Sequence, residues 1–199
     1  MTWQPDYVDL VDFRAFVNVG DTVDDAELGL ALTSASRAID DHCNRQFGQV
    51  AAAEERFYTA RIDHERCAWV VDVDDFMSVI GLVVVITDVG TVTTFTKEPV
   101  NAAAKGRPWE RLLFTDSSEF TPTGAPHEVA VTALWGWSAV LEQVQNATML
   151  QGSRFASRRN SPYGVAGSPD QGSELRLLSR VDPDVAVSLR GLRRTRAVG

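Results

Sequence analysis

The spacing of apolar residues changes twice along the chain, and this change restricts the fold more than any other feature. Over residues 24–45, apolar side chains recur every three or four positions, which is typical of a helix with one apolar side. These residues are Leu28, Leu32, Ala35, Ile39 and Cys43. From about residue 54 the period becomes two, and turn residues separate short runs rich in Val, Thr and Phe. The pattern predicts a helix followed by β-strands.

After Gly136 and Trp137 the helical spacing returns. We therefore predict an α+β protein with a helical bundle core and an inserted antiparallel β region at about residues 54–134. The core would comprise a long helix at about 24–45, a helix at about 139–158 and a C-terminal helix at about 183–193. A short helix near the N-terminus, with Asp9 as its N-cap, would precede them. The predicted domains are an adaptor domain over residues 1–159 and a linker with a C-terminal docking arm over residues 160–199.

The predicted strands lie in short runs separated by turn residues. Their ranges are residues 56–59, 67–72, 78–87, 91–96, 111–115 and 127–133. The run over residues 80–86 is apolar on both sides. It is therefore expected to be the most buried strand. Residues 97–109 contain two prolines and a glycine and are predicted to form a loop.

The length and composition are those of a folded domain that needs no covalent reinforcement. The chain has 199 residues, 44% of them apolar, which suffices for a hydrophobic core. Cys43 and Cys67 do not have a C-x-x-C spacing and are interpreted as thiols of a reducing compartment. The first residues do not show the basic and apolar regions of a signal peptide, and no segment has 18 uninterrupted apolar residues, so we predict neither export nor a membrane partner.

Charge is distributed unevenly along the chain. Residues 1–145 contain 10 basic and 23 acidic side chains, whereas residues 146–199 contain 9 arginines and 4 acids. The two parts therefore carry net charges of −13 and +5, which sum to the −8 of the whole chain. Charges of opposite sign at the two ends allow copies of the chain to associate head to tail, or the basic end to bind an acidic partner.

The C-terminal helix has clear local signals. Asp182 can cap it, Pro183 suits its first position, and its arginines suit the negative end of the helix dipole. Its apolar stripe is predicted to be exposed, beyond a flexible connection, as an arm that docks on a partner. The predicted partner-binding residues are Arg176, Arg180, Val185, Leu189, Arg190, Leu192, Arg193 and Arg194.

No catalytic motif is present in the sequence. The nucleophile elbow, the phosphate-binding loop, the dinucleotide fingerprint and the H-E-x-x-H zinc motif are all missing. A zinc site built from His42, Cys43, His64 and Cys67 can be imagined, but this spacing matches no common pattern. Asp72, Asp74 and Asp75 lack the turn glycine and closing glutamate of a calcium loop. We therefore predict that the protein is not an enzyme and uses neither a cofactor nor a metal.

The arginine-rich C-terminus leaves a second function open. A small DNA-binding regulator could place these cations on phosphates, because each cation near the backbone adds affinity. The acidic remainder of the chain would repel the same duplex, and no aromatic side chain lies among the arginines to stack on bases. DNA binding is therefore the alternative and not the main hypothesis.

The order of several short motifs resembles a known family. The motifs are Asp40-x-x-Cys43-Asn44-Arg45-x-Phe47, Pro99-x-Asn101-Ala102, Gly106-Arg107-Pro108-Trp109-x-x-Leu112, Val131-Thr132 ahead of Gly136-Trp137, Arg158-x-x-Ser161-Pro162-x-Gly164-Val165 and Asp182-Pro183-Asp184-Val185. In this order the chain resembles the head-to-tail connector, or adaptor, proteins of tailed phages with long non-contractile tails, especially phages of actinobacteria. One departure is the lack of a proline over residues 138–141.

The resemblance implies a structural virion protein without enzymatic activity. Such a protein would form a homo-oligomeric ring of about a dozen copies under the portal protein. Its other face would bind a head-completion (stopper) protein or a tail protein. Double-stranded DNA would pass through the ring without specific binding, because an acid-rich wall repels phosphate within a screening length of about 8 Å.

Overall fold

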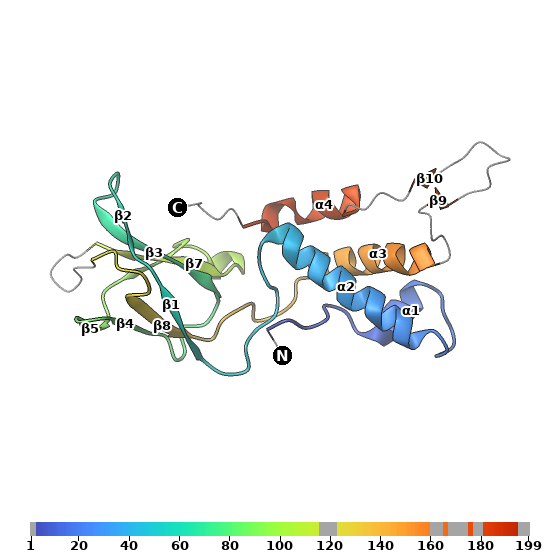
Figure 1. Ribbon diagram of the computed structural model, residues 1–199, viewed down its shortest axis with the longest axis horizontal. Coiled ribbons are helices and arrows are strands. Elements are labelled where there is room, and N and C mark those ends of the chain that lie inside the picture. The colour runs from blue at the N-terminus through green and yellow to red at the C-terminus, as the bar shows by residue number, and fades with distance from the viewer. Residues whose placement is uncertain (1–2, 116–122, 160–164, 167–174, 177–180, 195–199) are drawn as a thin grey trace. The chain divides into compact units, whose positions relative to one another are not determined.

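The computed structural model describes residues 3–115, 123–159, 165–166, 175–176 and 181–194. The chain forms two compact units (Figure 1). The β unit contains residues 1–4 and 46–139, and the helical unit contains residues 5–45 and 140–199. Over the described residues, no helix is both long enough and apolar enough to cross a membrane.

The β unit is built from two four-stranded antiparallel sheets. The first has the order β1-β8-β4-β5 and contains β1 (Glu54–Tyr58), β8 (Val129–Ala133), β4 (Val83–Ile86) and β5 (Gly90–Val92). The second has the order β2-β3-β7-β6 and contains β2 (Arg61–Asp63), β3 (Ala68–Phe76), β7 (Trp109–Phe114) and β6 (Thr96–Glu98). A short 3-10 helix, η1 (Ala103–Lys105), precedes β7.

The helical unit contains the helices α1 (Leu10–Phe16), α2 (Asp25–Cys43), α3 (Glu142–Arg159) and α4 (Pro183–Leu189). The 3-10 helix η3 (Arg190–Leu192) continues α4, and the strands β9 (Val165–Ala166) and β10 (Leu175–Arg176) pair as a two-stranded sheet. The predicted helices at 24–45 and 139–158 therefore exist with slightly different ends. Asn44, in a left-handed conformation with φ of 52°, ends α2.

The prediction of a helical bundle core is wrong. The protein is a mixed α/β structure whose large apolar core lies in the β unit and draws on both four-stranded sheets. The reason is side-chain size: α2 buries aliphatic side chains such as Leu32 and Ile39 together with small ones such as Ala35, whereas the β unit buries large aromatic ones. These include Trp135, Phe76 and Phe114. Large aromatic side chains supply far more buried apolar area than alanines.

The most buried strand is also different from the one predicted. In β3 the buried residues follow a largely alternating pattern, and Val71 and Phe76 are fully buried. In the run 80–86, Ile80 precedes β4 and is 81% exposed, and Val83 is 42% exposed. In β4 the buried residues Val84 and Ile86 alternate with the more exposed Val83 and Val85, as is common in antiparallel sheets.

Aromatic packing and one close backbone approach hold the end of β8 against the rest of the β unit. Trp135 packs edge to face on Phe76, and Trp137 packs on Phe47. The Trp137 indole N–H donates a buried hydrogen bond of 2.9 Å to the Asp75 carboxylate. Gly136 lies between the two tryptophans with φ of +106°. Its backbone N–H donates to the Asp75 carbonyl oxygen.

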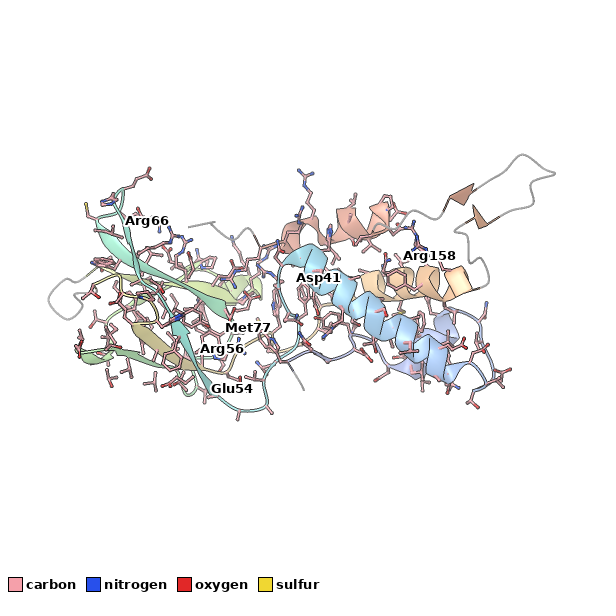
Figure 2. All side chains as sticks on the ribbon, in the orientation of Figure 1. Asp41, Glu54, Arg56, Arg66, Met77 and Arg158 are labelled. Carbon is pink, nitrogen blue, oxygen red and sulfur yellow. The ribbon has the colours of Figure 1, made fainter. Side chains whose placement is uncertain are left out.

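Ion pairs cover the strands next to this core. Arg56 on β1 contacts the Asp74 carboxylate at 2.8 Å and Glu54 at 3.5 Å, and its guanidinium stacks over the Trp3 ring (Figure 2). Arg66, near the turn between β2 and β3, pairs with Glu98 at 3.0 Å. The acids of the β unit are therefore partly neutralised by its own arginines.

Candidate partner-binding surfaces of the helical unit

Hydrogen bonds at Asp182 cap the start of α4 and attach it to α3. The Asp182 carboxylate accepts a hydrogen bond of 2.9 Å from the Asp184 backbone N–H, as an N-cap does. Arg154 on α3 donates to the same carboxylate at 3.0 Å. Gln151, also on α3, accepts from the Asp182 backbone N–H at 3.1 Å. The predicted helix start at Asp182 and Pro183 is confirmed.

The expectation that this helix exposes its apolar stripe is wrong. Val185 and Leu189 are fully buried, and Leu192 is 4% exposed. They are covered by the chain's own helical unit because α4 packs on α3. These three residues therefore hold α4 in place, and the arginines remain as the predicted partner-binding residues of this segment.

The chain after η3 is attached to the C-terminal end of α2. The Arg194 backbone N–H donates to the Cys43 carbonyl oxygen at 2.8 Å. The Asn44 side-chain amide donates to the Arg194 carbonyl oxygen at 3.3 Å. These bonds place cationic side chains at the negative end of the α2 dipole, where positive charge is favoured.

The predicted arginines lie in different environments. Arg190 and Arg193 are exposed and Arg194 is partly buried. In the part of the chain that the structure describes, neither Arg190 nor Arg193 forms an ion pair. Arg176 lies in β10, and Arg180 lies outside the described residues. We call Arg190, Arg193 and Arg194 the basic end.

Burial and the nearby basic end both affect His42, which lies on the last turn of α2. Burial lowers the pKa of His42, and the positive charge of Arg193 lowers it further. The imidazole is therefore neutral over more of the physiological pH range than a free histidine.

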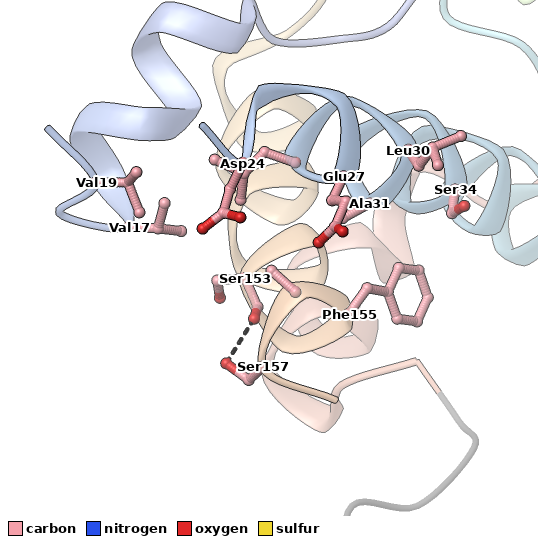
Figure 3. Close-up of a pocket in the computed structure, with 12 residues that line it drawn as sticks. Val17, Val19, Asp24, Glu27, Leu30, Ala31, Ser34, Ser153, Phe155 and Ser157 are labelled. Carbon is pink, nitrogen blue, oxygen red and sulfur yellow. Dashed lines mark hydrogen bonds between the residues drawn. The ribbon is translucent and has the colours of Figure 1, made fainter. Parts of the chain in front are cut away.

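An open groove lies near the other end of α2, where α2, α3 and the segment after α1 meet (Figure 3). Its volume is about 790 Å³. Its lining is largely apolar, and its two charged residues, Asp24 and Glu27, are acidic. The apolar lining residues include Val17, Val19, Leu28, Leu30, Ala31 and Phe155. The sequence alone does not predict this groove, because it forms only through tertiary contacts with α3.

The structure does not bring the candidate metal ligands together. Asp72 pairs with Arg61 and Arg111, Asp74 with Arg56, and Asp75 with Trp137. Burial raises the pKa of Asp72, but the hydrogen bonds from Arg111 and Arg61 outweigh this effect and lower it. Among the described residues, no group of three or more His, Cys, Asp or Glu side chains could hold a metal ion.

The two cysteines should differ strongly in reactivity. Cys43 is fully buried in α2, and burial raises the pKa of its thiol to about 11. Cys67 lies exposed in the turn before β3. Because the thiolate is the reactive form, a disulfide reagent should titrate one thiol per folded chain and two per unfolded chain. A Cys67→Ser variant should show none in the folded state. Rapid modification of Cys43 in the folded Cys67→Ser variant would contradict the buried position.

Comparison with known proteins gives a match of fold over the whole chain. A chain from the neck of an empty gene transfer agent particle, computed with C6 symmetry, aligns with a TM-score of 0.56 at 20% sequence identity. The alignment covers 100% of this chain and 96% of that chain. A chain from the virion of a native gene transfer agent particle aligns with a TM-score of 0.50 at 20% identity, over 97% and 92% of the two chains. The sequence matches no protein-family model and no curated protein.

Proposed function

We propose that the protein is a structural subunit of the neck of a tailed phage or phage-like particle. In this role it is a head-to-tail connector, or adaptor, that forms a ring under the portal, extends the DNA channel and links capsid to tail. The observation that carries the proposal is the full-length likeness in fold to a chain from the neck of a gene transfer agent particle. The match covers nearly all of both chains. It is therefore not limited to a small domain of the kind that occurs in many proteins with unrelated functions.

Sequence features support the same role. The ordered motifs from Asp40 to Val185 resemble those of siphophage connector proteins, and a phage of an actinobacterium is the proposed source. Residues 1–145 contain more acids than basic residues. An acidic channel wall would repel the phosphates of DNA and let the DNA pass without binding. The proposed partners are further copies of the chain, the portal, and a head-completion or tail protein.

The proposed ring contains about a dozen copies. The neck with the similar fold was computed with C6 symmetry. A sixfold axis accommodates six copies or a multiple of six.

Electron microscopy of the purified chain, with and without portal-bearing capsids, tests the proposal. We expect an annular density with a central hole, at least on capsids that carry the portal, and antibody labelling of this protein at the neck of intact particles. DNA affinity should stay weak at physiological salt. Absence of the protein from particles, or a monomer or dimer whose DNA affinity falls steeply with salt, would contradict the connector role and favour the DNA-binding regulator.

A further inference from the structure

The helical unit carries opposite charges at the two ends of its longest helix. Asp24 and Glu27 line the groove near the start of α2, and Arg194 is hydrogen-bonded to Cys43 at the end of α2. We infer that the groove of one copy binds the basic end of a second copy, so that copies associate head to tail. This inference deepens the proposed ring assembly, on which it rests, by naming the surfaces in contact.

A single chain cannot make this contact with itself. α2 has 19 residues, so at 1.5 Å per residue it is about 28 Å long. The bond between Arg194 and the Cys43 carbonyl holds the basic end at one end of that length. Asp24 lies at the other end. An arginine side chain spans only a fraction of this distance, so the basic end reaches a groove of this kind only on another copy.

The two surfaces also match in apolar character. The groove exposes apolar side chains, of which Leu30 is 70% exposed. On α4, Val187 is 75% exposed and precedes Arg190 by three residues, so the two side chains lie on the same side of the helix. Val187 with the neighbouring arginines therefore complements the apolar lining of the groove and its two acids, Asp24 and Glu27. Buried apolar area then supplies affinity, while charge fixes the orientation.

The contact is heterologous, because different surfaces of the two copies meet. Repetition of such a contact produces a closed ring when the rotation between copies closes, and an open filament when it does not. A twofold dimer could also place each basic end in the groove of the other copy, because in a twofold interface residue i contacts residue j while j contacts i. Such a dimer would stop at two copies, whereas head-to-tail repetition gives larger oligomers, so a sedimentation boundary that never exceeds a dimer would contradict head-to-tail assembly.

Two charge-reversed full-length variants test the contact. The groove variant carries Asp24→Arg and Glu27→Arg, and the basic-end variant carries Arg190→Glu and Arg193→Glu. Sedimentation velocity from micromolar to millimolar concentration measures self-association. Each variant alone should associate at least roughly tenfold more weakly than the wild type, because cation then faces cation or acid faces acid. An equimolar mixture should regain association, because each reversed surface meets a complementary one.

A control variant, Glu55→Arg with Glu65→Arg, changes the net charge by the same amount as the groove variant at exposed positions of the β unit, outside both surfaces. It should associate like the wild type. The inference is overturned if the wild type stays monomeric at millimolar concentration, if the variants associate normally, or if the mixture fails to recover. It is also overturned if the groove variant loses thermal stability while its association is unchanged, which would indicate that Asp24 and Glu27 act within one chain and not between copies.

Assembly into particles separates this inference from the proposed function. If both variants enter necks as efficiently as the wild type, the protein is a connector but this contact is wrong. If the wild type is absent from particles while the charge-reversed pair still restores association in solution, the contact stands and the connector role fails.

Discussion

Replacement of Gly136 by alanine should destabilise the β unit by about 3 to 5 kcal/mol. Gly136 has φ of +106°, which L side chains rarely adopt. A Cβ atom built there would lie 2.0 Å from the Gly48 carbonyl oxygen and 2.8 Å from the Gln49 Cα. Both neighbours are backbone atoms, so no side chain can rotate away to relieve the overlap. The two chain segments that meet at Gly136 and Gly48 would have to separate.

Tryptophan fluorescence during urea unfolding measures this effect, because all five tryptophans belong to the β unit. Gly90→Ala is the matched control: Gly90 has φ of +100°, but no atom lies within 4 Å of the position that a Cβ would take there. It should cost only about 1 to 2 kcal/mol, the strain of the backbone alone. Equal losses in the two variants would show that the close approach of Gly48 contributes nothing.

Leu189→Ala should destabilise the helical unit by about 2 to 5 kcal/mol, the usual range for a leucine truncated in a core. Leu189 is fully buried where α4 packs on the unit. The truncation leaves a cavity and weakens the attachment of α4, and with it the placement of Arg190, Arg193 and Arg194. Far-ultraviolet circular dichroism during urea unfolding follows the helices.

Val187→Ala serves as the control for Leu189→Ala, because Val187 lies on the same helix but is 75% exposed. It should change the free energy of unfolding by no more than about 0.5 kcal/mol. A loss as large as that of Leu189→Ala would mean that α4 does not pack by the side on which Leu189 lies.

The sequence predicts best what depends on neighbouring residues. The stripe from Leu28 to Cys43 predicts α2, and Asp182 with Pro183 predicts the start of α4. These signals operate within one or two turns, so they need no knowledge of the fold. The strands β2 and β6 have three residues each and are too short for a periodic signal.

The errors of prediction come from contacts between distant parts of the chain. The bond from Arg194 to Cys43 and the packing of Leu189 are invisible in the local pattern, which therefore predicts a free arm at α4. Ile80 and Val83 belong to an apolar run, but strand pairing decides which side chains face the core. The groove near Asp24 requires α3, which follows the whole β unit in the chain.

The division of the helical unit into two chain segments has a consequence for synthesis on the ribosome. α2 emerges early, whereas α3, its main packing partner, is translated only after every strand of the two large sheets. Until α3 is synthesised, the apolar side of the nascent α2 remains exposed to solvent. Bringing α2 and α3 together closes a loop that contains residues 46–139, which costs conformational entropy unless those residues have already folded. If the strands fold first, α2 and α3 are already close together when α3 is synthesised. Pauses in translation before residue 142 should therefore increase the yield of folded protein and reduce aggregation.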